Sequence, residues 1–130
     1  MILLDTHAWL WWLSDPSRLS HRAAQRIEAA RADGVVAIST ISAWEAALLV
    51  QKGRLELRLP VRDVVAACER LPFFRFVPIG AEIAIAAVEL GGLHADPADR
   101  LIIATARHEG LELVTKDERL QAWPGVTTTW

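Results

Sequence analysis

The chain has 130 residues, of which 52% are hydrophobic and 23% charged, so it has room for one domain with one core and is not a disordered chain. The formal net charge of -2 excludes strong overall attraction to nucleic acid. Because no apolar run approaches the ~20 residues of a membrane-spanning helix, and Cys68 is the only cysteine, we expect a single domain over residues 1–130 in the cytoplasm.

Short apolar runs rich in Val, Ile and Leu alternate with longer stretches of helical periodicity, which is typical of a parallel α/β sheet. The predicted strands, in chain order, are residues 2–4, 35–39, 75–79, 113–115 and 126–129. The predicted helices are residues 7–13, 20–32, 43–52, 61–71, 81–90 and 97–109. The glycines that should stop helices are Gly34, Gly53, Gly91 and Gly110.

Six tryptophans are a conspicuous feature of the composition, and three of them lie in the run AWLWWL after the first strand. Their helical spacing favours packing in the core or an interface over stacking on bases. A cluster so close to the first strand leaves Trp11 or Trp12 partly exposed, which indicates a surface for a partner. Cys68 lies in the apolar run VVAACERL and is predicted to be a core residue.

Two acids follow predicted strands directly, namely Asp5 in ILLDTH and Asp117 in ELVTKD. An acid at such a position can cap a helix or initiate a turn, and it can also face a ligand. Two acids at the ends of two buried parallel strands favour the second interpretation.

Two further acids lie near the starts of predicted helices. Ser42 and Glu45 match the S-x-x-E capping box. Asp96 before Pro97 is a helix cap, and it leaves Asp99 at the third helical position, where an acid favours the helix dipole. Taken singly, each of these acids has a sufficient structural role.

Fold geometry brings these four acids together. In a parallel sheet the helices run antiparallel to the strands, so helix N-termini share an edge with strand C-termini. Open α/β sheets bind their ligands at that edge. We therefore expect a common site for the acidic quartet of Asp5, Glu45, Asp99 and Asp117.

Clustered carboxylates repel, and each like-charge contact at ~4 Å costs on the order of 4 kcal/mol at an effective dielectric of ~20. Oxygen ligands of this kind suit Mg²⁺ or Mn²⁺, whereas the spacing of His7 and His94 does not match a zinc motif. A bound cation polarises a phosphoryl oxygen and activates a water molecule. The predicted chemistry is therefore hydrolysis of a phosphodiester.

The segments DTHAWLWWL, TISAWEAALL, HADPADRLIIATA and ELVTKD together resemble the PIN-domain ribonucleases, and specifically the VapC toxins of bacterial toxin–antitoxin pairs. The resemblance covers nearly the whole chain and depends on the order and spacing of four motifs that are individually weak. It implies a three-layer α/β fold with about five mostly parallel strands flanked by helices. It also implies a Mg²⁺ or Mn²⁺ site, RNA cleavage, a homodimer and a neutralising antitoxin.

The resemblance assigns the acidic quartet as the catalytic and metal-binding residues, matched position by position. Thr6 and Thr115 are candidates to hydrogen-bond these carboxylates, and Arg100 or Lys116 to contact phosphate. Asp96 is not a member of the quartet and is kept as a helix cap.

Two alternatives remain open. A phospho-receiver signalling domain has a similar size and fold, but it needs an acidic pair after the first strand and a lysine after the fifth, whereas Asp5 stands alone and Lys116 follows the fourth. A PIN ribonuclease of RNA maturation, without an antitoxin, would carry the same residues. The net charge of -2 counts against RNA binding, although 12 of the 14 basic residues are arginine and a bound cation would cancel charge at the site.

Overall fold

A computed structural model of the chain describes residues 1–92 and 96–130. His94, which the sequence analysis considered as a metal ligand, lies outside the described residues.

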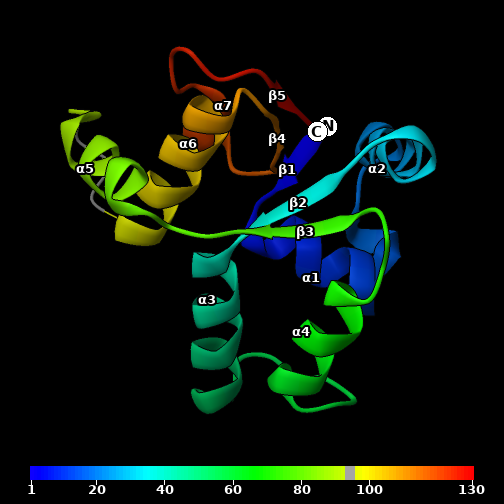
Figure 1. Ribbon diagram of the computed structural model, residues 1–130. Coiled ribbons are helices and arrows are strands. Elements are labelled where there is room, and N and C mark those ends of the chain that lie inside the picture. Colours follow the sequence, from blue (N-terminus) through cyan, green and yellow to red (C-terminus); the bar gives the residue numbers. More distant parts are fainter. Residues whose placement is uncertain (93–95) are drawn as a thin grey trace.

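The sheet has five strands in the order β3-β2-β1-β4-β5, and every neighbouring pair is parallel (Figure 1). Their bounds are β1 Ile2–Leu4, β2 Val36–Ser39, β3 Phe74–Val77, β4 Glu112–Val114 and β5 Thr128–Thr129. The predicted five-stranded parallel sheet is confirmed, and each strand lies within its predicted range or extends one residue beyond it. The last strand is shorter than predicted, because only Thr128 and Thr129 pair with β4.

Seven α-helices and one 3₁₀ helix lie in the described part of the chain. They are α1 Thr6–Ser14, η1 Pro16–Arg18, α2 His21–Asp33, α3 Thr40–Gln51, α4 Val61–Glu69, α5 Ala81–Glu89, α6 Pro97–Glu109 and α7 Glu118–Gln121. The six predicted helices are all present. Sequence periodicity missed η1 and α7, because three or four residues are too few to show a helical repeat. Gly53, Gly91 and Gly110 follow helices with positive φ, as stop signals should.

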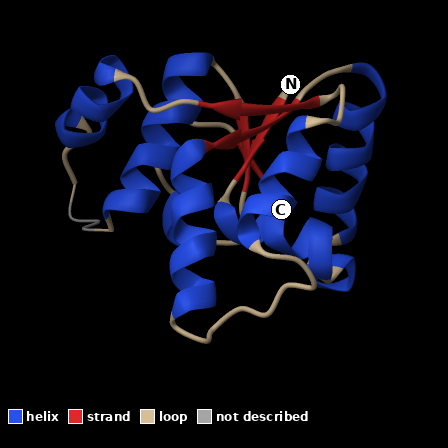
Figure 2. Ribbon diagram, turned by 60° about the horizontal axis from the view of Figure 1, so that its bottom comes forward, coloured by secondary structure: helices blue, strands red, loops and turns tan. Residues whose placement is uncertain are grey.

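Helices cover both faces of the sheet, which makes the three layers (Figure 2). Successive strand residues point to opposite faces, so Ile2 and Leu4 belong to one core cluster and Leu3 to the other. The first cluster includes side chains of α1, α2 and α4, and the second includes side chains of α5 and α6. This two-sided burial explains why β1 and β2 are buried along their whole length without alternation, whereas the edge strand β3 contains the exposed Arg75. No helix in the described ranges is long and apolar enough to cross a membrane.

The tryptophans divide between the core and the surface. Trp9 is fully buried, with its ring edge-on to Phe76 at a centroid distance of 5.9 Å. Trp11 and Trp12 are half-buried, as predicted for at least one of them. The most exposed indole, at 58%, is that of Trp44, which the sequence patterns did not single out. Cys68 is buried, as predicted, and burial raises the pKa of its thiol.

Candidate active site

Asp5 occupies the turn between β1 and α1 and is the most buried member of the acidic quartet, with 7% exposure. One carboxylate oxygen accepts the Ala8 N–H at 2.8 Å, which caps α1, and the other accepts the Thr115 hydroxyl at 2.5 Å. Burial raises the pKa of Asp5 from its ordinary value of 3.8, these hydrogen bonds oppose the shift, and the charge of Asp99 adds to it. Asp5 is therefore the cap of α1 as well as a member of the predicted site, and the hydrogen bond predicted between Thr115 and a quartet carboxylate is present.

Glu45 lies in the second turn of α3, and the predicted capping box between Ser42 and Glu45 is wrong. The helix begins at Thr40, directly after β2, and its cap is Ser39, whose hydroxyl accepts the Ile41 N–H at 3.2 Å. Because the strand passes into the helix without a loop, the helix starts three residues before the predicted residue 43. Ser42 is instead buried inside the helix.

Thr6 connects Glu45 to the start of α1. The Thr6 hydroxyl donates a hydrogen bond to the Glu45 carboxylate, and its oxygen lies 2.8 Å from that of Ser42. Burial raises the pKa of Glu45, the Thr6 hydrogen bond opposes this shift, and the charge of Asp99 adds to it. The contact predicted for Thr6 is thereby confirmed.

Asp99 lies in the first turn of α6, and the predicted cap at Asp96 is confirmed. The Asp96 carboxylate accepts the N–H groups of Ala98 and Asp99 at 2.9 and 3.3 Å. Asp99 is therefore not the cap of this helix. Its charge instead acts on two other members of the quartet, since it raises the pKa of both Asp5 and Glu45.

Asp117 caps the short helix α7, because its carboxylate accepts the Arg119 N–H at 2.9 Å. The Arg119 guanidinium also donates to both oxygens of this carboxylate, at 3.2 and 3.0 Å. The Asp117 N–H donates to the Thr115 hydroxyl oxygen at 3.1 Å, so Thr115 links Asp117 to Asp5. Arg119 was missed by the sequence analysis, although an arginine two residues after a capping acid is a recognisable signal.

A cavity of about 500 Å³ brings all of these elements together. All four members of the acidic quartet line it, along with Asp96. Thr6, Trp11, Lys116 and Arg119 line it as well. The predicted convergence at the carboxyl edge of the sheet is therefore present in the structure.

The PIN domain family model matches residues 2–125 of the chain. The chain belongs to the PIN-domain family. Ribonuclease VapC22 of Mycobacterium tuberculosis (strain ATCC 25618 / H37Rv) is 40% identical over 132 residues, which cover 99% of this chain and 98% of that protein. This match, like the family model, excludes the phospho-receiver alternative.

Two solved structures have the same fold as this PIN domain. VapBC2 from Rickettsia felis, bound to a DNA fragment from its promoter, matches with a TM-score of 0.71 and 19% identity over 99% of this chain and 98% of the other. A toxin–antitoxin complex from Klebsiella pneumoniae matches with a TM-score of 0.67 and 26% identity over 100% and 98% of the two chains.

Arg100 has a different environment from the one predicted. Its guanidinium donates to the backbone carbonyls of Ala87, Val88 and Gly91 at 3.0, 3.3 and 2.9 Å, around the end of α5. It does not line the acidic cavity, so the predicted phosphate contact is not supported for Arg100. Lys116 does line the cavity and is exposed, and its phosphate contact stays a prediction.

The quartet of this PIN domain shares a cavity but does not form a ready coordination cluster. Within residues 1–92 and 96–130, no three His, Cys, Asp or Glu side chains are grouped so that they could hold a metal ion. The local contacts explain this arrangement: Asp5 is held by Thr115, Glu45 by Thr6 and Asp117 by Arg119. These three carboxylates are thus stabilised by their own neighbours, and mutual repulsion opposes closer approach.

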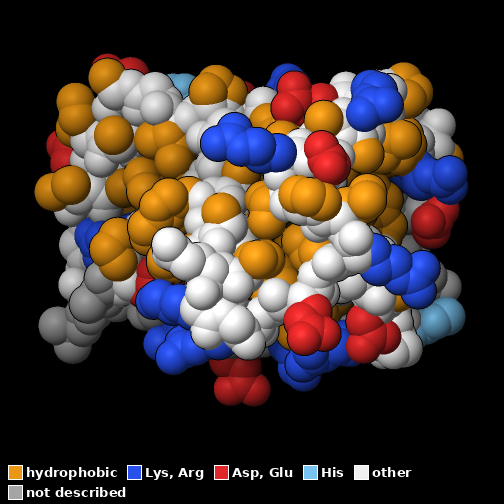
Figure 3. All heavy atoms as spheres, turned by 90° about the horizontal axis from the view of Figure 1, so that it is seen from below, with side chains coloured by type: hydrophobic (Ala, Val, Ile, Leu, Met, Phe, Trp, Pro, Cys, Tyr) orange, Lys and Arg blue, Asp and Glu red, His pale blue; other side chains and the backbone are white. Residues whose placement is uncertain are grey.

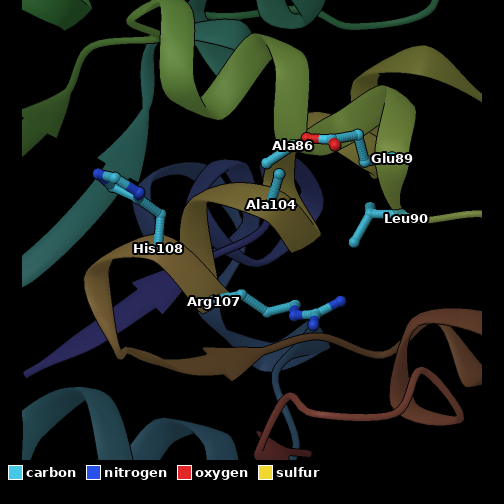
Figure 4. Close-up of a pocket in the computed structure, with 6 residues that line it drawn as sticks. All are labelled: Ala86, Glu89, Leu90, Ala104, Arg107 and His108. Carbon is cyan, nitrogen blue, oxygen red and sulfur yellow. The ribbon is translucent and has the colours of Figure 1, made fainter.

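A second cavity, of about 420 Å³, lies between α5 and α6 (Figure 4). Its charged lining consists of Glu89, Arg107 and His108, and Figure 4 shows the last two pointing to opposite sides of α6. With one carboxylate and no converging set of polar groups, it is a weaker candidate for catalysis than the acidic cavity.

We predict that Asp99→Asn raises the stability of the metal-free protein at neutral pH. Removing the Asp99 charge favours the ionised forms of Asp5 and Glu45, and the Asp96 cap is retained. The expected rise in melting temperature is about 1–4 °C, measured by calorimetry with a chelator present. The matched control is Asp63→Asn in the first turn of α4, which should be neutral or slightly destabilising.

The stabilisation expected from Asp99→Asn should depend on pH, because Asp99 repels the Asp5 carboxylate only when that group is ionised. Because the folded-state pKa of Asp5 is raised, the native protein keeps a proton on this carboxyl where the unfolded chain has lost it. Stability conferred by this group is therefore lost as pH rises from about 3.8 through the raised pKa. The gain from Asp99→Asn should shrink in mildly acidic buffer, and an equal or lower melting temperature at neutral pH would contradict the repulsion argument.

Proposed function

We propose that this PIN domain is a divalent-metal-dependent endoribonuclease and the toxin of a toxin–antitoxin pair. The proposal rests on one observation above all, the acidic quartet that lines a single cavity at the carboxyl edge of the sheet. The identity of 40% to a protein named ribonuclease VapC22 supports RNA as the substrate. The similar toxin–antitoxin complex from Klebsiella pneumoniae supports an antitoxin as a partner, and we place the protein in the cytoplasm, where RNA is abundant.

The donor set of the cavity fits Mg²⁺ or Mn²⁺. All four candidate ligands, Asp5, Glu45, Asp99 and Asp117, offer carboxylate oxygens, which hard cations prefer. His7 also lines the cavity, but one imidazole beside four carboxylates does not make a typical zinc site. Mg²⁺ keeps several of its waters and takes only one or two carboxylates directly, so it does not require three side chains in contact. A cation would also offset the charge of Asp99, which adds to the effect of burial in raising the pKa of Asp5 and Glu45.

A bound cation would supply charge that polarises a phosphoryl oxygen and activates a water. The chain itself supplies orientation and a proton acceptor. The Thr115 hydroxyl and the Ala8 N–H hold the Asp5 carboxylate in one orientation, and Thr6 does the same for Glu45. The pKa of both carboxyls is raised by burial, and Glu45 is the better placed of the two to take a proton from the attacking water, because it is less buried than Asp5.

A PIN ribonuclease of RNA maturation remains the alternative within the same chemistry. It would use the same cavity and differ in having no antitoxin. No contact in the described residues favours it, whereas the relatives of this chain favour the toxin assignment.

Two apolar grooves flank α3 and offer surfaces for partners. Figure 3 shows hydrophobic side chains gathered across the middle of one face, with charged residues around them. One groove, of about 480 Å³, includes Trp44, Leu48 and Pro97, and it reaches Glu45 of the acidic quartet. The other, of about 600 Å³, lies between α3 and α4 and includes Ala47 and Val65. We propose that a second copy of the chain covers the first groove and that an antitoxin covers other apolar surface.

Asp99→Asn should abolish RNA cleavage in a protein that stays folded. An amide keeps the shape of the side chain but removes the charge that attracts the cation, and a loss of about 100-fold or more is expected when one electrostatic group leaves a catalytic site. The measurement is cleavage of a labelled RNA by purified protein, with Asp63→Asn as the folded acidic control. Full activity of Asp99→Asn would remove Asp99 from the catalytic set.

Chelation with EDTA should stop cleavage, and added Mn²⁺ or Mg²⁺ should restore it. Zn²⁺ should substitute poorly, because the quartet is made of hard oxygen donors only. Binding can be read independently of activity, since Mn²⁺ should raise the melting temperature of the wild-type protein as its concentration passes the dissociation constant. Cleavage that continues unchanged in EDTA would rule out the metal-dependent mechanism.

Trp44→Ser should shift the protein from dimer to monomer. The Trp44 indole is exposed in one chain, and in a two-fold symmetric dimer both copies of it would be buried. The substitution therefore removes two buried indoles from each dimer interface. Sedimentation velocity at several concentrations measures the change. Val50→Ser, which removes a residue with 39% exposure at the other end of α3, is the control and should leave the dimer intact. A wild-type protein that sediments as a monomer would refute the proposed interface.

A further inference from the structure

Cations and aromatic rings gather over Trp11 on one side of the acidic cavity. The Arg18 guanidinium carbon lies 4.6 Å from the centroid of the Trp11 ring, and the Lys116 ammonium nitrogen lies 5.7 Å from it. The rings of His7 and Trp130 lie 5.6 and 5.8 Å from the same indole, measured between centroids. Trp11 and Lys116 also line the acidic cavity, so this group continues directly into the candidate active site.

The backbone holds Arg18 beside Trp11. The Asp15 N–H donates to the Trp11 carbonyl at 2.8 Å, and the Arg18 N–H donates to the Asp15 carbonyl at 3.1 Å. The Ser17 hydroxyl donates to the Asp15 carboxylate at 2.6 Å, which braces the short helix η1. The position of Arg18 over the ring is thus built into the connection between α1 and η1.

Both cations keep their charge available to a ligand. Arg18 and Lys116 are exposed, and within the described residues neither forms an ion pair with a carboxylate. Arg119, in contrast, is engaged by Asp117. A cation over an aromatic face is oriented by the ring, while its N–H groups at the edge remain able to donate to an anion.

We propose that Arg18 and Lys116, positioned by Trp11, form a binding subsite for the phosphate groups of the RNA strand next to the scissile bond. This inference rests on the proposed function, since it assigns a subsite to the same RNA substrate. The two cations are the phosphate-binding residues, and Trp11 is a positioning residue that acts through them. We call this group the Trp11 subsite.

Charge explains why the enzyme needs such a subsite. The chain has a net charge of -2, and its catalytic cavity is acidic, so the protein as a whole does not attract a polyanion. Affinity for RNA must come from a local concentration of cations outside the quartet. The Trp11 subsite provides two of them beside the cavity, because Lys116 lines it and Arg18 lies over the ring of Trp11, which lines it too. A strand with one phosphate at the quartet would place its neighbouring phosphates on this side.

The test measures RNA binding separately from cleavage. All variants are made in the Asp99→Asn background, and their affinity for a fluorescein-labelled single-stranded RNA of mixed sequence is measured by anisotropy over a series of KCl concentrations. Arg18→Gln and Lys116→Gln should each weaken binding by about three- to tenfold, the range for the net loss of one solvent-exposed hydrogen bond. Each should also reduce the slope of log affinity against log salt by about 0.7, the value for one phosphate on a single strand.

Trp11 provides the discriminating variant, because its removal changes no charge. Trp11→Ala should weaken binding and reduce the salt slope as the charge variants do, and Trp11→Phe, which keeps an aromatic face, should restore both. Arg54→Gln, an exposed arginine beyond the far end of α3, is the charge-matched control and should change neither. Melting curves verify that each variant is folded, and Arg18→Gln tests the subsite without altering a half-buried ring.

The outcomes separate this inference from the proposed function. If Arg18→Gln and Trp11→Ala bind RNA with the affinity and salt slope of Arg54→Gln, the Trp11 subsite is refuted. The proposed function would still stand if the protein with Asp99 intact cleaves RNA in the presence of Mn²⁺. Conversely, if the slopes change as expected but the protein with Asp99 intact never cleaves RNA in the presence of Mn²⁺, the nuclease assignment is overturned and the Trp11 subsite is only an RNA-binding surface.

Discussion

The parallel direction of all five strands is the constraint on which the rest of this PIN domain depends. It sends each strand's carboxyl end to one edge, and the helices that return the chain must begin there. Backbone hydrogen bonds hold this edge together, because the Asp5 N–H donates to the Val114 carbonyl and the Thr115 N–H donates to the Thr129 carbonyl. Side chains from distant parts of the sequence therefore meet without any long excursion of the chain.

Helix capping and the proposed metal binding use the same carboxylates at this edge. A helix N-terminus carries unpaired N–H groups and a partial positive charge, so it favours an acid at or near its first turn. Asp5 and Asp117 each satisfy such N–H groups for α1 and α7, and Asp96 does so for α6. Capping anchors these carboxylates, and the hydroxyls of Thr6 and Thr115 anchor the acidic quartet further. The protein thus holds Asp5, Glu45 and Asp117 around one cavity by giving each of these carboxylates its own donor.

Charge is separated within the site and not distributed over the whole surface. The acidic quartet lines the cavity, while cations at its rim are held over the Trp11 ring or against Asp117. A net charge of -2 therefore says little about what the cavity attracts. What matters is which charges are near each other, and opposite charges at short range outweigh a small net charge that salt screens over about 10 Å.

The sequence by itself determined the fold class, the six longer helices and the position of each strand, and it predicted that the four acids of the quartet would meet at one edge, where they line one cavity. These follow from short-range patterns: apolar runs, helical periodicity and acids at predictable places beside them. It also predicted the hydroxyl partners Thr6 and Thr115, because Thr6 directly follows Asp5 in sequence and Thr115 ends a predicted strand, two residues before Asp117.

Only the tertiary structure decided the rest. It showed that Glu45 is not part of a capping box, because α3 begins directly at the end of β2. It turned Arg100 toward the end of α5, and it placed Arg18 and Lys116, about a hundred residues apart, over one indole ring. Long flexible side chains take their direction from whatever packs around them, and no local pattern in the sequence specifies that environment.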